Sequence, residues 1–259
     1  MAVSIRAFSE MSAPDQTSPI TLEPDGRVIL LSGATGGIGA AMARRLLSDG
    51  FTVSVGVRNL EKAAEMFDGA DPDRFAAFRF DASDIDTADA WVDATIARFG
   101  RIDGLINNAG ILRQISLTEG EETLLDELWT VNVKAPFRLI RLAMPHLART
   151  GAGRIINVAS TDAKRYREGV SVGYTMTKHA LLALSHAAKT AGWKDGVRCT
   201  ALCPGAVDTE LIASIPGVTP AAERIRPETL AEAVAFLLRM PNNASVPELI
   251  ANSRLESSI

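Results

Sequence analysis

Tyr174 and Lys178 are two residues whose side chains can pass a proton between them. They stand four positions apart in the stretch 171–189, whose apolar spacing predicts a helix, so both side chains are expected on one face of it. A phenol has a reference pKa of about 10 and is a weak base at neutral pH. A neighbouring ammonium favours the phenolate, so we expect Lys178 to lower the pKa of Tyr174 and prepare it for general acid–base chemistry.

Ser160 is a second group that can act on a substrate. It follows the apolar run 154–159, which predicts a buried strand, and open α/β sheets bind their ligands at the carboxyl ends of strands. Its hydroxyl can donate a hydrogen bond to an oxyanion that develops on a carbonyl group. No histidine stands beside it, so a nucleophilic serine is not supported. The histidines fall in predicted helices and are interpreted as structural or surface residues: His146, His179 and His186.

Asn132 lies in a long stretch of helical apolar spacing, 124–144, four residues before Pro136. Proline has no N–H, so the carbonyl of Asn132 lacks its usual helical partner. That carbonyl can hold a water molecule that connects Lys178 to solvent in a proton relay. A proline kink that serves only packing is the alternative.

A glycine-rich segment, residues 32–39 (SGATGGIG), follows the first β-rich run and opens a helical pattern. Glycines permit positive φ and a close backbone approach to a pyrophosphate, and a helix N-terminus offers free N–H groups and a positive dipole end. A plain tight turn would also explain glycines here. The position between a strand and a helix favours a phosphate-binding loop.

The second β-rich run, 52–57, is followed by Arg58 and Asn59, with no acidic residue at this point. In dinucleotide-binding folds an acid at this position binds the adenine ribose hydroxyls of NAD, whereas an arginine accommodates the 2′-phosphate of NADP. Arg58 therefore favours NADP, with NAD still possible. A solvated surface arginine is the alternative reading.

The elements that must position these residues alternate from Arg27 onward between short β-rich runs and amphipathic stretches. This alternation predicts a single-domain α/β doubly wound (Rossmann) fold, with a central parallel sheet of about seven strands covered by helices on both faces. The expected strands are 27–32, 52–57, 75–80, 104–107, 154–159, 197–202 and 248–251. The domain is expected over residues 26–259, after a flexible polar arm over residues 1–25, in which either Met1 or Met11 can be the translation start.

Composition excludes several classes of protein. The 259 residues include 27 Lys and Arg against 31 Asp and Glu, a net charge of −4, which argues against nucleic acid as a partner. We expect no membrane span, no secretory signal and no metal site, and therefore a cytoplasmic protein. Cys199 and Cys203 stand in an apolar run and are interpreted as buried strand residues rather than as part of a disulfide framework.

Four motifs occur in order: the glycine loop, Asn107-Asn108-Ala109-Gly110, Tyr174-x-x-x-Lys178 and Pro204-Gly205. Together they resemble the short-chain dehydrogenase/reductase family from Arg27 to about Thr209. The resemblance implies that the catalytic residues are Asn132, Ser160, Tyr174 and Lys178. It implies cofactor binding by Gly33, Thr35, Gly37, Ile38, Gly39, Arg58, Asp81, Ala82, Asn108, Ala109, Gly110, Tyr174, Lys178, Pro204, Gly205, Val207 and Thr209.

Asp81 matches the adenine contact of the family, but capping of the next helix, through Ser83 or Asp84, explains the local sequence equally well. Thr209 resembles the residue that contacts the nicotinamide carboxamide. The turn-rich segment beyond it occupies the family's substrate-lid position. The C-terminus resembles a branch of NADP-linked 3-hydroxy-acid and aldehyde reductases, which supports NADP and weakens the case for the usual tetramer contact.

The resemblance predicts an NAD(P)-dependent oxidoreductase that transfers hydride between nicotinamide and a carbonyl or secondary alcohol of a small molecule. A homodimer or a homotetramer is expected. The alternatives are an epimerase or dehydratase of the same family, which the short chain beyond Pro204 disfavours, and a non-catalytic dinucleotide-binding regulator, which would be expected to lose Tyr174, Lys178 or Ser160.

The segment between Ser160 and Tyr174 carries three cations, Lys164, Arg165 and Arg167, partly offset by two acids, Asp162 and Glu168. Because this loop joins the catalytic strand to the catalytic helix, part of it should border the substrate cleft. One cation turned inward would pair with a carboxylate or phosphate of the substrate. A solvated loop or a subunit contact is the alternative.

Overall fold

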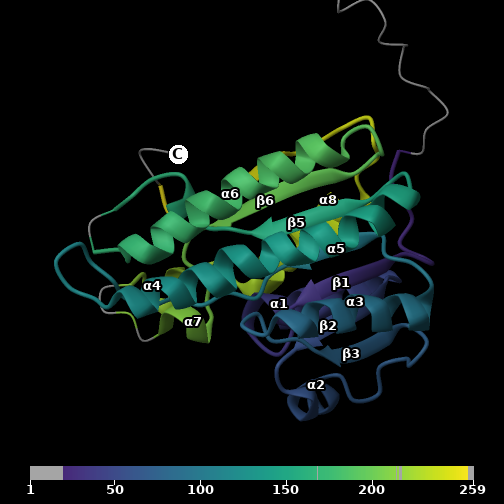
Figure 1. Ribbon diagram of the computed structural model, residues 1–259, viewed down its shortest axis with the longest axis horizontal. Helices are drawn as coiled ribbons and strands as arrows, with labels where there is room; N and C mark the ends of the chain where they lie inside the picture. The colour runs from purple at the N-terminus through teal and green to yellow at the C-terminus, as the bar shows by residue number, and fades with distance from the viewer. Residues whose placement is uncertain (1–19, 168, 214, 216–217, 256–259) are drawn as a thin grey trace, which may run out of the picture.

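A seven-stranded parallel sheet forms the centre of the molecule, in the order β3-β2-β1-β4-β5-β6-β7 (Figure 1). The computed structural model describes residues 20–255 except 168, 214, 216 and 217. The strands are β1 (Val28–Ser32), β2 (Thr52–Val57), β3 (Phe75–Arg79), β4 (Gly104–Asn107), β5 (Arg154–Val158), β6 (Arg198–Pro204) and β7 (Glu248–Ala251). The doubly wound α/β prediction is therefore confirmed, and the strand order reverses between β1 and β4, where such folds open a crevice for ligands.

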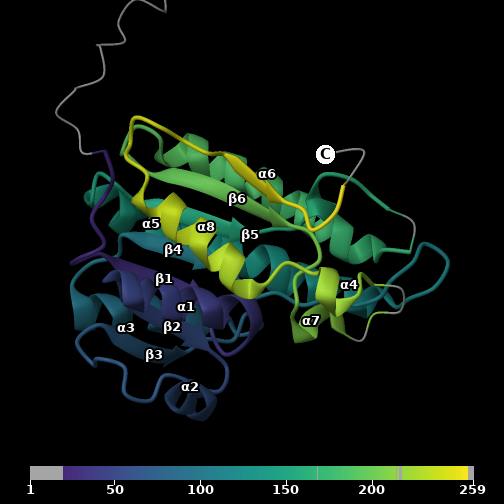
Figure 2. The ribbon, with the colours of Figure 1, turned by 180° about the vertical axis from the view of Figure 1, so that it is seen from behind.

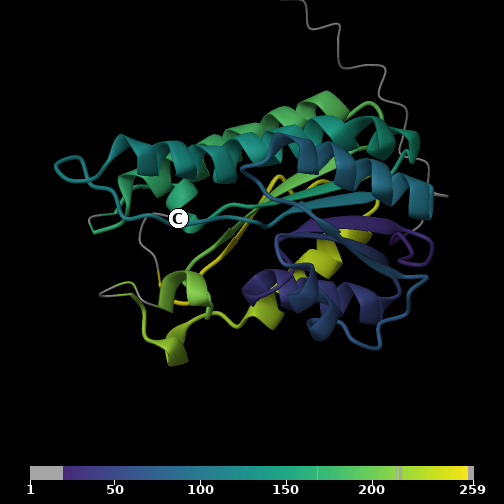
Figure 3. The same ribbon diagram turned by 60° about the horizontal axis from the view of Figure 1, so that its bottom comes forward.

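Helices cover both faces of the sheet (Figures 2 and 3). One apolar cluster joins α1, α2 and α8 to the sheet, and a second joins α3, α5 and α6 to its other face. The helices are α1 (Gly37–Asp49), α2 (Leu60–Met66), α3 (Ile85–Phe99), α4 (Glu122–Trp129), α5 (Ala135–Arg149), α6 (Val172–Gly192), α7 (Glu210–Ala213) and α8 (Pro227–Arg239). Shorter turns are the π-helical η1 (Thr130–Lys134) and the 3₁₀ turns η2 (Thr161–Ala163) and η3 (Ala221–Glu223).

The strands are apolar on both faces because each face is packed against helices. All residues of β1, β2 and β5 are buried. The predicted strand limits agree with the observed ones to within two residues, and β6 runs on to Pro204, which pairs with Ala251 of β7. Cys199 and Cys203 are buried on β6, as expected. Within the described residues, none of the helices has the length and apolarity needed to cross a membrane.

Arg27 directly precedes β1, and its buried guanidinium binds carbonyl groups. Its Nη1 donates to the Leu238 carbonyl at 2.6 Å and its Nη2 to the Ala152 carbonyl at 3.2 Å. The Leu22 N–H donates to the Arg239 carbonyl at 2.7 Å, and Pro24 is buried. Leu22 is thus bonded to the end of α8, while the flexible arm predicted over residues 1–25 remains a prediction. Residues 1–19 lie outside the described part of the chain.

Candidate active site

The glycine loop connects β1 to α1 and leaves backbone N–H groups available at the helix N-terminus. Gly33 and Gly37 have φ values of 74° and 48°, which favour glycine. Gly36 precedes the helix without a side-chain cap, and the first turn of α1 carries no acid. This end of α1 therefore keeps its N–H groups and its positive dipole end for an anionic ligand.

Gly39 has no room for a side chain. A Cβ at this position would lie 2.1 Å from the Gly33 carbonyl oxygen. The Asn108 amide donates to the carbonyls of Ser32 and Gly33 at 3.0 and 2.9 Å, and the Ser32 hydroxyl accepts the N–H groups of Asn108 and Ala109. The structure thus uses the Asn108 side chain to hold the loop after β4 against the glycine loop, a role that its cofactor assignment did not include.

Two predicted adenosine contacts follow β2 and β3. Arg58 is exposed directly after β2, and the next residue, Asn59, caps α2 by accepting the Lys62 N–H. The Asp81 carboxylate accepts the Ser83 N–H at 2.9 Å, whereas the N-cap of α3 is Asp84. Capping of α3 is therefore done by Asp84 and not by Asp81. Asp81 lies after β3, next to the buried Ala82.

The segment after β6 returns to the glycine loop. The Gly205 N–H donates to the Ala251 carbonyl, and Val207 forms an isolated parallel bridge with Ile225. A Cβ on Gly37 would lie 2.9 Å from Thr209 Cγ2, so Thr209 lies against the start of α1. The carboxyl edge of the sheet thus brings together predicted cofactor residues from three segments, which follow β1, β4 and β6. They are Gly33, Thr35, Gly37, Ile38, Gly39, Ala109, Gly110, Pro204, Gly205, Val207 and Thr209.

Asn132 lies at the centre of η1, where the Ala135 N–H donates to the Thr130 carbonyl five residues earlier. The sequence suggested a plain proline kink as one alternative, and the helix instead widens into a π turn before Pro136, an arrangement common at functional sites. The buried Asn132 amide accepts the Ile111 N–H and donates to the Ile111 carbonyl, both at 2.9 Å. It also donates to Thr177 Oγ1 on α6 at 3.2 Å, which fixes η1 to α6.

Lys178 is buried on α6, one turn after Tyr174. Its Nζ donates to the Val158 carbonyl at 2.9 Å at the end of β5 and lies 5.4 Å from the centre of the Tyr174 ring. Burial disfavours the ammonium and lowers the pKa of Lys178 to about 8, with the nearby Cys203 thiol acting in the opposite direction. Lys178 can therefore gain or lose a proton near neutral pH.

Tyr174 and Ser160 face each other at the carboxyl end of β5. Burial raises the pKa of Tyr174 above its ordinary value, the charge of Asp162 raises it further, and hydrogen bonding to Ser160 acts in the opposite direction. The expected lowering of the pKa of Tyr174 by Lys178 is wrong, because desolvation of the phenolate is the largest effect on Tyr174 and burial also disfavours the charged form of Lys178. Tyr174 consequently holds its proton, as a general acid must.

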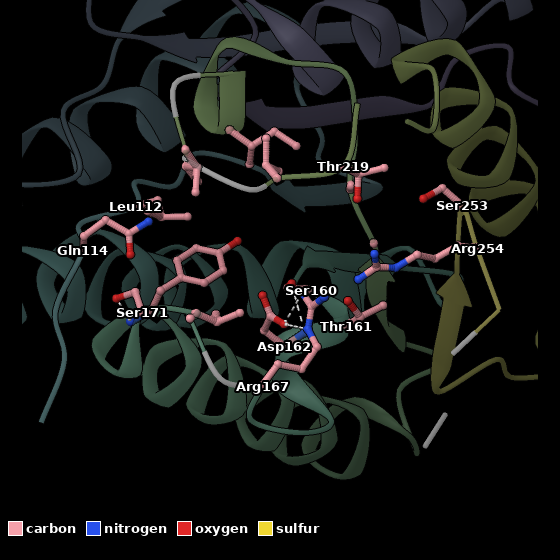
Figure 4. Close-up of a pocket in the computed structure, with 18 residues that line it drawn as sticks. Leu112, Gln114, Ser160, Thr161, Asp162, Arg167, Ser171, Thr219, Ser253 and Arg254 are labelled. Atoms are coloured by element: carbon pink, nitrogen blue, oxygen red, sulfur yellow. Dashed lines mark hydrogen bonds and ion pairs between the residues drawn. The ribbon is translucent and has the colours of Figure 1, made fainter. Parts of the chain in front are cut away.

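A cavity of about 500 Å³ opens beside Ser160 and Tyr174 (Figure 4). Ile212, Ile215, Val218 and Thr219 line it from the segment that was predicted to be a lid. Of the loop cations, Arg167 lines the cavity, whereas Lys164 pairs with Glu248 at 2.6 Å and Arg165 donates to the Thr161 carbonyl. Glu168 lies outside the described residues.

Three residues that support the site were not found by sequence reasoning. Ser171 caps α6 by accepting the Tyr174 N–H, and its hydroxyl donates to the Arg113 carbonyl at 2.6 Å. Thr177 donates to the Tyr174 carbonyl while it accepts the Asn132 amide. Asp162 is buried beside Ser160, and its N–H donates to the Ser160 hydroxyl oxygen at 3.0 Å. The serine before the helix was the one visible signal, since serine is a favoured helix cap.

The histidines have structural partners. His179 Nδ1 contacts the Thr175 carbonyl, His146 contacts Arg149, and His186 Nε2 lies 3.0 Å from Glu248. None of the three lines the cavity among the described residues.

The sequence profile of the short chain dehydrogenase family matches residues 27–217. The chain belongs to the short-chain dehydrogenase family. Agropine synthesis reductase of Rhizobium rhizogenes is 39% identical over 221 residues, which are 85% of this chain and 51% of that protein. The chain thus spans about half the length of that relative.

Solved structures of the short-chain dehydrogenase fold agree. The 3-ketoacyl-(acyl-carrier-protein) reductase of Brucella melitensis, complexed with NADH, superposes with a TM-score of 0.81 at 29% identity, covering 88% of this chain and 98% of that one. The alcohol dehydrogenase of Thermococcus sibiricus, complexed with 5-hydroxy-NADP, superposes with a TM-score of 0.80 at 31% identity, covering 89% and 99%.

Proposed function

We propose that this short-chain dehydrogenase is an NADP-dependent oxidoreductase that interconverts a carbonyl group and a secondary alcohol on a small molecule. One observation carries the proposal: Ser160, Tyr174 and Lys178 meet at the carboxyl end of β5, on the same edge of the sheet as the uncapped N-terminus of α1. Asn132 anchors the same helix through Thr177.

The residues present fit a dinucleotide. The N-terminus of α1, between Gly33 and Gly37, suits a pyrophosphate, because its N–H groups carry neither a side-chain cap nor a neighbouring acid. The exposed Arg58, with no acid after β2, suits a 2′-phosphate. When bound, the nicotinamide supplies or accepts the hydride.

The chain itself moves the proton. Tyr174, held protonated by burial, donates its proton to the carbonyl oxygen during reduction, while the Ser160 hydroxyl donates a hydrogen bond to that oxygen. The Ser160 oxygen already accepts the Asp162 N–H, which leaves its own proton for the substrate. Lys178, with a pKa of about 8, returns a proton to Tyr174, and the carbonyl of Asn132 holds the water that supplies it.

The test is oxidation of NADPH, followed by its absorbance, with a panel of aldehydes and ketones. The proposal predicts turnover with at least one compound and slower turnover with NADH. No oxidation by wild type, or equal oxidation by the Tyr174→Phe variant, would contradict it.

We also propose a cytoplasmic homodimer or homotetramer that binds no nucleic acid. Support comes from Phe137 of α5 and Met176 of α6, large apolar side chains that are 48% and 46% exposed. Light scattering on the purified protein tests the oligomeric state, and a monomer at micromolar concentration would contradict it.

A further inference from the structure

An ion pair forms part of the wall of the cavity beside Ser160 and Tyr174. Nη2 and Nε of Arg167, from the loop before α6, both donate to Oδ1 of Asp162, at 3.0 and 3.3 Å. The side chains of Asp162 and Arg167 are 11% and 35% exposed, and both residues line the cavity. Together the two side chains have no net charge, so the pair does not select a substrate by charge alone.

The pair keeps both donors and acceptors open at the cavity. A guanidinium has five N–H donors, and among the described residues only Asp162 accepts from those of Arg167. The second carboxylate oxygen of Asp162 accepts from no described residue, and it is not enclosed. A hydroxyl group both donates and accepts, so it can donate to Asp162 while it accepts from Arg167. A carboxylate has no proton to donate and would meet the negative charge of Asp162.

Neutral hydrogen-bonding side chains surround the rest of the cavity: Gln114, Thr161, Thr219 and Ser253. Their side chains have no hydrogen-bond partner among the described residues, since it is the backbone carbonyls of Thr161 and Thr219 that accept arginine donors. Figure 4 shows Thr219 and Ser253 across the cavity from Thr161 and Asp162. A substrate with several hydroxyl groups can bind to these side chains, whereas an apolar substrate would leave them without partners.

The pair lies beside the reacting atoms. The Asp162 N–H donates to the Ser160 hydroxyl oxygen at 3.0 Å, and the charge of Asp162 reaches Tyr174. A hydroxyl group bound by the pair is consequently only a few carbons away from a carbonyl carbon held by Ser160 and Tyr174.

We propose that the substrate is a neutral carbonyl compound with several hydroxyl groups, or the corresponding polyol, and that Asp162 and Arg167 bind one of these hydroxyl groups near the reacting carbon. This rests on the proposed function. The cavity of about 500 Å³ lies within the size range of small-molecule sites, so a small polyol fits it.

The experiment compares kcat/KM with NADPH for pairs of ketones in which a methyl group replaces each hydroxyl group: hydroxyacetone and 2-butanone, dihydroxyacetone and 3-pentanone, 4-hydroxy-2-butanone and 2-pentanone. We expect wild type to prefer the hydroxylated ketone of at least one pair by roughly tenfold or more, the size of a hydrogen bond to a charged group. A hydroxyl group beside the carbonyl also makes its carbon more electrophilic. The readout is therefore the change of this ratio on substitution, which general damage to the enzyme does not move.

Two variants should lower the ratio of hydroxylated to methyl ketone. Asp162→Asn removes the charged acceptor and Arg167→Gln removes the charged donors, so each should reduce the ratio by roughly tenfold. Lys164→Gln is the matched control. It breaks another ion pair of the same loop, to Glu248 at 2.6 Å, and neither of these residues lines the cavity, so the ratio should stay as in wild type. An equal loss of kcat/KM for both ketones in the pair variants would overturn the proposal.

Pyruvate is the charged comparison, because Arg254, which has an interaction of its own, also lines the cavity. Wild type should use hydroxyacetone in preference to pyruvate. Asp162→Asn leaves the charge of Arg167 without its acid, so it should shift the preference toward pyruvate. A wild-type preference for pyruvate would contradict the proposal.

A binding measurement covers the case in which none of these ketones is turned over. Saturation-transfer NMR gives the Kd of erythritol for the protein–NADPH complex, in which an alcohol cannot be oxidised, and butane-1,4-diol is the comparison with fewer hydroxyl groups. Tighter binding of erythritol that is lost in both pair variants supports the hydroxyl site even if no carbonyl is reduced, and then the proposed function alone fails. Reduction of ketones with ratios that do not depend on Asp162 and Arg167, or equal binding of the two alcohols, overturns this proposal and leaves the proposed function in place.

Discussion

The two halves of the carboxyl edge of the sheet present different chemical groups. Around β1 the surface consists of backbone, with Gly33 and Gly37 at positive φ and a helix N-terminus free of side-chain caps. Around β5 and β7 it consists of side chains, among them the Asp162–Arg167 pair. Backbone N–H groups fit any pyrophosphate in the same way, whereas charged side chains select one substrate from many. The backbone surface around β1 can thus stay constant across a family while the side chains around β5 and β7 change.

The largest effect should come from removing the Tyr174 hydroxyl, the proposed proton donor. Tyr174→Phe keeps the ring in its buried place, so the fold and the cofactor affinity should be unchanged. Turnover should fall by roughly 10² to 10⁴, the usual contribution of a positioned acid. Steady-state rates and a cofactor titration measure this, and an active variant would remove Tyr174 as the proton donor.

The glycine loop after β1 should not tolerate a single added methyl group at Gly39. Gly39→Ala places a Cβ 2.1 Å from the Gly33 carbonyl oxygen, a backbone atom that cannot move aside easily. We expect the free energy of unfolding to fall by about 3 kcal/mol in a urea titration. Gly36→Ala is the control, since nothing lies within 4 Å of its Cβ and its φ of 173° suits any residue. Equal stability of both variants would mean that the loop is more pliable than its packing indicates.

On the β1 side of the edge, Arg58 is the side chain expected to contribute to cofactor binding. Arg58→Ala should weaken NADPH by about 1–3 kcal/mol, the value of a charge-assisted contact, and leave NADH nearly unchanged. Calorimetric titration of both cofactors decides this. Tighter binding of NADH than of NADPH by wild type would already refute the assignment.

The rate of carbonyl reduction should show an upper pH limit set by Lys178. Its pKa of about 8 means that the ammonium is present below that pH and lost as the pH rises through it. Carbonyl reduction needs that proton, so kcat should be level below pH 8 and fall by roughly tenfold per pH unit above it. A pH profile at saturating substrate tests this, and a constant rate up to pH 9.5 would contradict it.

The sequence predicted the positions that depend on regular elements and missed those that depend on loops. Tyr174 and Lys178 share a helix face by their spacing, and Ser160 follows a strand, so their meeting could be expected. The pairing of Lys164 with Glu248 could not, because it joins residues 84 apart whose approach depends on the fold. The direction of the Tyr174 pKa was also mispredicted, since the cost of burying a charge depends on packing that spacing does not reveal.

The attachment of Arg27 to the end of α8 has a consequence for how the chain folds. The arginine precedes β1, an inner strand of the sheet, yet its guanidinium binds a carbonyl 211 residues later. On a ribosome, β1 emerges early and must wait for almost the whole domain before this contact can close. Contacts of such long sequence separation slow folding and leave early intermediates open to aggregation. The glycine loop after β1 also waits for later parts of the chain, because Asn108 and Thr209 lie against it.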